Sequence, residues 1–143
     1  MDKPARRREC FARIKSLAPA ERSAASARIR SFLAGSPLFR QANTIFSYAA
    51  LSGEPDLGAL VSAFPEKNWA FPKVDRENRL AFYSVAPNET LSRGTLGISE
   101  PSPLPERLLS PGVPDLVLVP GVSFDPASLT RLGIDTIDLY YAH

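Results

Sequence analysis

Lys3 and Arg7 are two basic residues near the start of the chain, one helical turn apart. Side chains four positions apart project from the same face of a helix, so these two can contact one phosphate group together. The plainer interpretation is a solvated run of charge, because Arg6 and Arg8 flank Arg7 directly. The residues by themselves favour that plainer interpretation.

Two carboxylates stand where a binding site is expected. Glu54 follows Gly53 in a turn after an apolar strand pattern, and Glu100 lies in a proline-rich segment. A carboxylate offers two acceptor oxygens to a ligand edge rich in N–H donors. Glu54 can instead cap a helix expected at 56–64, but Asp56 can do that and leave Glu54 for function. Glu100 is equally a pocket carboxylate or a plain loop residue.

Polar residues also follow predicted strands. The apolar run 116–119 predicts a strand buried on both faces, which stops at Pro120. Ligands gather at the carboxyl ends of such strands, which draws attention to residues 123–125. Lys73, directly after Pro72, is a weaker candidate near the end of another strand.

The elements that must position these residues alternate between helix and strand. Apolar spacing predicts helices at 4–17 and 19–35, the second with proline in its first turn and glycine at its end. Strands are expected at 44–49, 69–74, 80–85 and 115–120, with Trp69 and Tyr83 in the core, and a long loop at 86–114. This order predicts a three-layer α/β domain with a central, mostly parallel sheet.

Composition narrows the class of protein. The 143 residues suit one domain, and neither a membrane span nor a secretory signal is visible. The single cysteine, Cys10, favours a cytoplasmic setting and a core thiol. Residues 1–30 hold nine Lys/Arg against three Asp/Glu. A basic end can bind nucleic acid, but here it lacks interleaved aromatics, so a solvated helical face is the better interpretation.

Several sequence blocks together resemble one family. Besides the Lys-x-x-x-Arg spacing, they are "IFSYAALSGEPDL" (45–57), "FPKV" (71–74), "LAFYSV" (80–85), "LGISEPSP" (96–103) and "DLVLVPGVSFD" (115–125). In this order they resemble the 5-formyltetrahydrofolate cyclo-ligases, also called methenyltetrahydrofolate synthetases, over residues 3–125. We therefore expect a cyclo-ligase-like domain at 1–126.

The resemblance implies an enzyme that uses ATP and Mg²⁺ to turn 5-formyltetrahydrofolate into 5,10-methenyltetrahydrofolate. Lys3 and Arg7 would face ATP, with Arg131 as a further candidate, and Ala49 and Glu54 would face folate. Glu100 is a further substrate-binding candidate. The resemblance implies a small-molecule folate and ATP as partners, in a monomer that binds neither nucleic acid nor membrane. Catalytic residues and metal ligands are not identified.

The tail at 127–143 departs from this pattern. "SLTRLGIDTIDLYYAH" (128–143) resembles an aldo-keto reductase segment, with a helix expected at 127–132 and a strand at 136–142. The family's glycine-rich loop is replaced at 134–139 by residues that include two isoleucines and two aspartates but no glycine. We expect no reductase activity, a bystander role for His143 and an impaired ATP site. Fusion, frameshift, truncation and misassembly all remain open as origins, and a folate-binding remnant is the alternative function.

Overall fold

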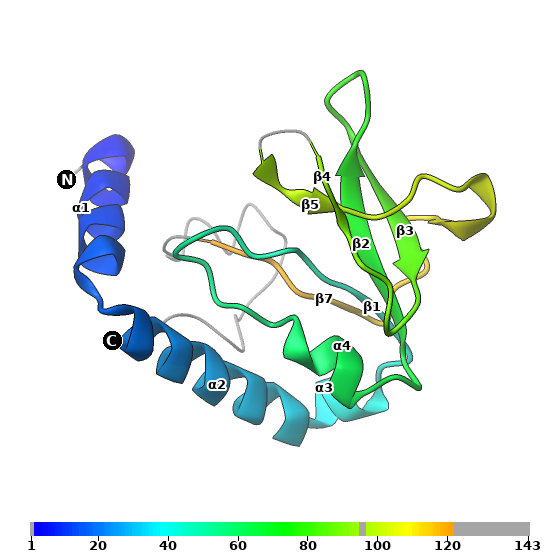
Figure 1. Ribbon diagram of the computed structural model, residues 1–143, viewed down its shortest axis with the longest axis horizontal. Coiled ribbons are helices and arrows are strands. Elements are labelled where there is room, and N and C mark those ends of the chain that lie inside the picture. The colour runs from blue at the N-terminus through cyan, green and yellow to red at the C-terminus, as the bar shows by residue number, and fades with distance from the viewer. Residues whose placement is uncertain (1, 95–96, 122–143) are drawn as a thin grey trace.

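The computed structural model describes residues 2–94 and 97–121 as an α/β fold (Figure 1). Its helices are α1 (Lys3–Ser16), α2 (Pro19–Gly35), α3 (Pro37–Gln41) and α4 (Ala59–Ala63), with a 3₁₀ turn η2 (Pro105–Arg107). Its strands are β1 (Thr44–Phe46), β2 (Asn68–Val74), β3 (Leu80–Val85), β4 (Ser92–Arg93), β5 (Ser99–Glu100), β6 (Leu108–Leu109) and β7 (Leu116–Val117). The predicted α/β class is confirmed.

Local signals explain where the helices begin. The Asp2 carboxylate accepts a hydrogen bond of 2.7 Å from the Ala5 N–H and so caps α1. Proline stands in the first turn of α1, α2 and α3, where its missing N–H costs nothing. The helices predicted at 4–17 and 19–35 are confirmed to within a residue. The one-turn helix α3 was not predicted, since five residues are too few for a periodic pattern.

The central sheet is mixed and has the order β6-β3-β2-β1-β7. Strand β1 lies between two parallel neighbours, with Ile45 opposite both Trp69 of β2 and Leu116 of β7. Strands β3 and β6 add antiparallel pairs at the other edge. The parallel part of the sheet, β2-β1-β7, therefore has its carboxyl ends at one common edge.

Four sequence-based bounds need correction. The helix expected at 56–64 is the shorter α4, Ala59–Ala63. Strands β1 and β7 end at Phe46 and Val117, short of the predicted 49 and 120, because their chains leave the ladder into loops. The segment 86–114 is more than a loop, since it contains the β4–β5 hairpin, η2 and the sheet's edge strand β6. Two-residue strands carry too little alternation to be predicted. The helix and strand expected at 127–132 and 136–142 lie outside the described residues.

Helices α2, α3 and α4 pack against one face of the sheet. Trp69, which is 1% exposed, donates its indole N–H to the Phe64 carbonyl at the end of α4. The ring of Phe39 on α3 meets that of Phe64 edge to face at 5.0 Å. The predicted core role of Trp69 is confirmed. On the opposite face of the sheet the rings of Phe46 and Phe82 stack at 4.3 Å.

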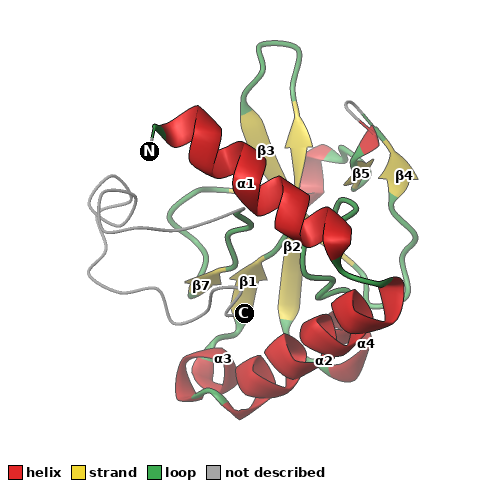
Figure 2. Cartoon of the chain, turned by 90° about the vertical axis from the view of Figure 1, so that its left-hand side faces the viewer, coloured by secondary structure: helices red, strands yellow, loops and turns green. Residues whose placement is uncertain are grey.

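Helix α1 stands apart from this core in Figure 1, and in the turned view of Figure 2 it crosses in front of strands β2 and β3. Its one buried residue is Ile14. A Cβ added to Gly53 would come within 2.9 Å of the Ile14 side chain, and Gly53 has a φ of +92° that other residues rarely adopt. Helix α1 is therefore docked on the loop that follows β1. Among the described residues, no helix combines the length and apolar character that crossing a membrane requires.

Candidate functional site

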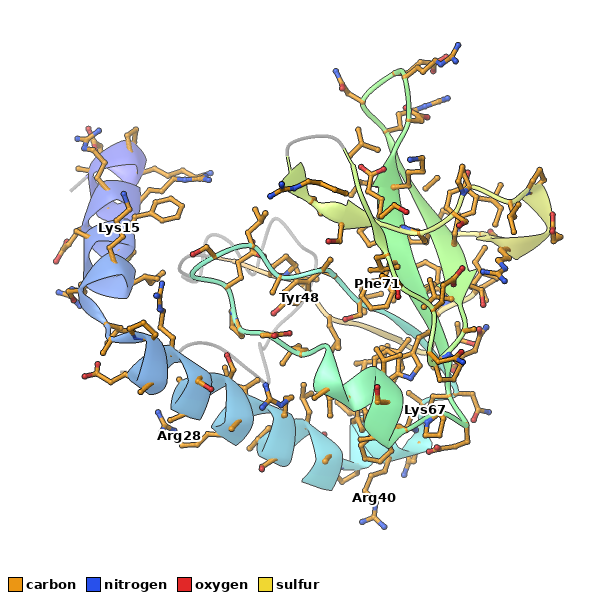
Figure 3. The ribbon with its side chains drawn as sticks, in the orientation of Figure 1. Lys15, Arg28, Arg40, Tyr48, Lys67 and Phe71 are labelled. Carbon is orange, nitrogen blue, oxygen red and sulfur yellow. The ribbon has the colours of Figure 1, made fainter. Side chains whose placement is uncertain are left out.

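A cavity of about 390 Å³ lies beyond the carboxyl end of β1. Three parts of the chain enclose it: the loop after β1, helix α4, and the sheet with the segment that follows β3. Its lining residues are Tyr48, Ala49, Ala50, Asp56, Gly58, Val61, Ser62, Phe71, Val85, Ala86, Pro87, Glu89, Leu91 and Ser99. Figure 3 shows Tyr48 and Phe71 in the middle of the molecule, whereas Lys15 lies on α1 at one side. The cavity thus combines an apolar floor with a few polar groups, as ligand sites usually do.

The loop after β1 is held by its own hydrogen bonds. The Tyr48 hydroxyl donates to the Pro55 carbonyl at 2.8 Å. The half-buried Glu54 accepts a bond of 3.0 Å from the Leu51 N–H with its carboxylate, while its own N–H donates to the Leu51 carbonyl. Ala49, for which the family resemblance implied a contact with folate, lines the cavity. Glu54 lies in the adjoining turn and is not among the lining residues.

Asp56 has a different role from the one its position suggested. Helix α4 begins at Ala59 with Gly58 as its N-cap, and no side chain caps it. The Asp56 carboxylate instead accepts a bond of 2.9 Å from the Gly58 N–H, which closes a turn before the helix. Its backbone is fixed by α2, since Ser26 accepts from its N–H and Arg30 donates to its carbonyl. The predicted capping role is wrong, and Asp56 is a cavity residue.

Glu89 is a cavity carboxylate that the sequence analysis missed. Its Oε1 lies 2.5 Å from Nη1 of Arg107, and its Oε2 accepts a bond of 3.2 Å from the Ala86 N–H. Both side chains are partly buried. The available signal was its place in the turn after strand β3, the same kind of position that singled out Glu54. Its partner Arg107 is 18 residues away along the chain, beyond any local pattern.

Glu100 and Lys73 form a second ion pair beside the cavity. Glu100 is only 3% exposed, and its Oε2 lies 2.7 Å from Nζ of Lys73. Ser99, its neighbour in β5, lines the cavity. Glu100 belongs to strand β5 rather than to a loop, and it is not itself among the residues that line the cavity.

Lys3 and Arg7 lie away from the cavity. Both are exposed on α1, which contributes none of the lining residues. The Arg7 guanidinium stands 5.4 Å from the centroid of the Phe11 ring. The structure therefore brings Ala49, Asp56 and Glu89 together, with Glu54 and Glu100 next to them, but it does not bring the two basic residues into that group. Arg131, His143 and residues 123–125 lie outside the described residues.

Two carboxyl groups with a lowered pKa, those of Asp115 and Asp75, stabilise a strand end and a turn. Hydrogen bonds from the Thr44 and Asn43 N–H groups, both 2.9 Å, hold the pKa of Asp115 below its usual range. The Arg79 and Glu77 N–H groups lower the pKa of Asp75 in the turn between β2 and β3. Neither residue lines the cavity, so both pKa shifts reflect hydrogen bonds that stabilise the fold and not the chemistry of the cavity.

The charged groups that line the cavity are acidic. Asp56 and Glu89 suit a ligand edge that donates hydrogen bonds, whereas they would repel a triphosphate. Within residues 2–94 and 97–121, no three His, Cys, Asp or Glu side chains gather as metal ligands. The described residues would suit a magnesium ion held mainly by the phosphate oxygens of a nucleotide, with one or two carboxylates added, as Mg²⁺ commonly binds.

Comparisons with known proteins agree with the sequence blocks. The sequence model of the 5-formyltetrahydrofolate cyclo-ligase family matches residues 1–134. The NMR structure of Aquifex aeolicus 5,10-methenyltetrahydrofolate synthetase superimposes with a TM-score of 0.78 at 31% identity, over 87% of this chain. The match spans 63% of the length of that protein. Curated protein sequences give no match.

The family match also bears on the tail. It continues past residue 126 to residue 134, so it includes the first part of the segment that resembles an aldo-keto reductase. The comparisons give that second resemblance no support. The match to the family model, the colinear sequence blocks and the shared fold have one consistent explanation: the chain belongs to the 5-formyltetrahydrofolate cyclo-ligase family.

Proposed function

We propose that this chain catalyses the ATP-dependent conversion of 5-formyltetrahydrofolate to 5,10-methenyltetrahydrofolate. The observation that carries the proposal is a cavity of about 390 Å³ with two carboxylates, Asp56 and Glu89, in a chain of the cyclo-ligase family. A reduced pterin carries several N–H donors along one edge, and carboxylate oxygens are suitable acceptors for them.

The cavity supports a division of labour among its residues. Phe71, Val61, Val85 and Leu91 offer an apolar surface to the face of the ring system. Asp56 and Glu89 would accept hydrogen bonds from the ring edge, with Arg107 keeping Glu89 in place. Ala49 leaves room for the ring at the end of β1. We retain Glu54 as a substrate contact, since its carboxylate has acceptor capacity beyond its bond to the Leu51 N–H.

The reaction requires that an unreactive formyl carbon become electrophilic. ATP supplies the activation when its terminal phosphoryl group is transferred to the formyl oxygen with release of ADP. The neighbouring amine nitrogen then bonds to the formyl carbon and loses its proton to water, and the C–O bond breaks to release phosphate. The protein must keep both substrates in register and exclude water. We assign the phosphates to Lys3 and Arg7 on α1, with Arg131 as a third candidate, and Mg²⁺ to the nucleotide.

A second candidate is a folate-binding protein with impaired phosphate handling. It is favoured by residues 134–139, which carry two aspartates and no glycine where phosphate-binding backbone is expected. Glycine lets consecutive amides turn toward phosphate oxygens without an intervening Cβ. In this case the cavity would still bind 5-formyltetrahydrofolate.

One experiment separates the two functions. The near-ultraviolet absorbance of the methenyl product is followed with and without MgATP, and calorimetry measures folate and MgATP binding separately. The proposed enzyme forms product only with ATP and binds both ligands. Folate binding without nucleotide binding supports the remnant, and product formation that is independent of ATP contradicts the mechanism.

A further inference from the structure

The ion pair between Lys73 and Glu100 has no part in the function proposed so far, yet it is built into the fold. A buried carboxylate is costly unless it is paired and hydrogen-bonded. Glu100 is 3% exposed and lies 2.7 Å from Lys73, whereas the surface pair of Arg79 and Asp75 is open to water on both sides. Glu100 is therefore held where a carboxylate is normally excluded.

The backbone around Glu100 is shaped to accept it. A Cβ on Gly94 would overlap the carboxyl end of the Glu100 side chain, so no other residue fits there without displacing it. Gly94 also donates its N–H to the Ile98 carbonyl at 2.8 Å, which ties the two strands of the hairpin together. The β4–β5 hairpin thus fixes the Glu100 side chain against β2.

Strand β2 places Lys73 on the side of the sheet that carries the cavity. Side chains two positions apart in a strand share a face, so Trp69, Phe71 and Lys73 project together. Trp69 is in the core and Phe71 lines the cavity. Lys73 is not itself a lining residue, but it stands two positions beyond the lining residue Phe71, and its partner Glu100 directly follows the lining residue Ser99. The Lys73–Glu100 pair therefore adjoins the cavity lining through both of its strands.

The chemistry of the pair decides what it can bind. The Lys73 ammonium has three N–H donors, its side chain is 33% exposed, and the charge of Glu100 compensates its own. A compensated ammonium is a poor partner for a triphosphate but a well-directed donor to a single oxygen. Resting on the function proposed above, we infer that Lys73 donates a hydrogen bond to an oxygen of the folate substrate, with Glu100 as its positioning residue.

Binding measurements test this inference directly. Calorimetry with 5-formyltetrahydrofolate and, separately, with MgATP is carried out on the full chain and on Lys73→Met, Glu100→Gln and the double variant. Loss of a charge-assisted hydrogen bond weakens folate binding by about tenfold to hundredfold in Lys73→Met, with MgATP binding unchanged. Glu100→Gln weakens folate binding by a smaller factor.

The double variant distinguishes positioning from a merely structural role. If Glu100 acts through Lys73, then Glu100→Gln has no further effect on folate binding once Lys73 is methionine. The double variant also removes both charges together, so it leaves no buried carboxylate without its lysine and keeps the comparison valid if Lys73→Met folds poorly. Arg79→Gln, which removes an exposed basic residue in the turn between β2 and β3, is the control for charge and leaves both affinities unchanged.

Two outcomes would overturn the inference while the proposed function stands: unchanged folate affinity in the double variant, or a loss of MgATP affinity instead of folate affinity. If the wild-type chain does not bind 5-formyltetrahydrofolate at all, both the proposed function and this inference are wrong.

Discussion

The cavity and helix α1 are held by the fold in very different ways. Around the cavity, carboxylates are paired with Arg107 and Lys73, and the floor residue Phe71 belongs to the core. Helix α1 carries exposed basic residues and is anchored by one buried side chain, Ile14. The part proposed to bind folate is therefore preorganised, whereas the part proposed to bind phosphate is a charged helix surface with little burial among the described residues.

The largest expected effect comes from truncating the cavity floor. Phe71 is 5% exposed, so Phe71→Ala leaves a cavity in the core and lowers the free energy of unfolding by about 3–5 kcal/mol. The matched change on α1 is Phe11→Ala, at a residue 40% exposed, and it costs less than about 1 kcal/mol. Urea unfolding of the two variants measures the difference. Equal losses would show that α1 is as much a part of the core as the cavity floor.

Next in size is the loss of the two basic residues on α1. If they contact phosphate, Lys3→Met and Arg7→Met together raise the KM for ATP by about tenfold to hundredfold, since each removes a charge-assisted contact. Stability stays within about 0.5 kcal/mol, because both side chains are exposed. Lys15→Met, an exposed lysine on the same helix, is the control. Steady-state kinetics with varied ATP decides the matter, and an unchanged KM removes α1 from the nucleotide site.

A smaller effect is expected at the turn that joins the two regions. Glu54→Ala should raise the KM for 5-formyltetrahydrofolate by about tenfold, because a carboxylate acceptor is lost. The fold should remain nearly intact, since the variant gives up a single exposed hydrogen bond to the Leu51 N–H. Thermal unfolding and kinetics are measured on the same sample. A large drop in Tm with unchanged kinetics would make Glu54 a structural residue of its turn.

The smallest effect concerns acid stability at the opposite end of β1. The folded state lowers the pKa of Asp115 below its ordinary value of 3.8, through the N–H groups of Thr44 and Asn43. Such a group stabilises the fold fully above the unfolded pKa, and the stabilisation is lost as the pH falls through the folded pKa. Asp115→Asn therefore lowers the urea midpoint at pH 7, and its difference from the wild type narrows below pH 3.8. A difference that does not change with pH would assign the effect to packing.

Much of the fold follows from local patterns, but the short elements do not. Helices α1 and α2 and strands β2 and β3 are long enough for their apolar spacing and proline positions to predict them. Strand β6 has two residues and gains its place only by pairing with Phe82 and Tyr83 of β3. The role of Asp56 also depended on the tertiary structure. Its place near the start of a helix suggested that it caps that helix, but its carboxylate accepts from the Gly58 N–H in the loop before the helix.

The amino-acid sequence by itself determined the family and the α/β class, because these depend on colinear motifs and on spacing within single elements. The tertiary structure decided which charged groups face the cavity and which ones hold them. Glu89 meets Arg107 across 18 residues, and Lys73 meets Glu100 across 27. Such pairs depend on how the β4–β5 hairpin and η2 pack against β2 and β3. Burial makes an unpaired charge costly, so each buried carboxylate requires a basic partner nearby.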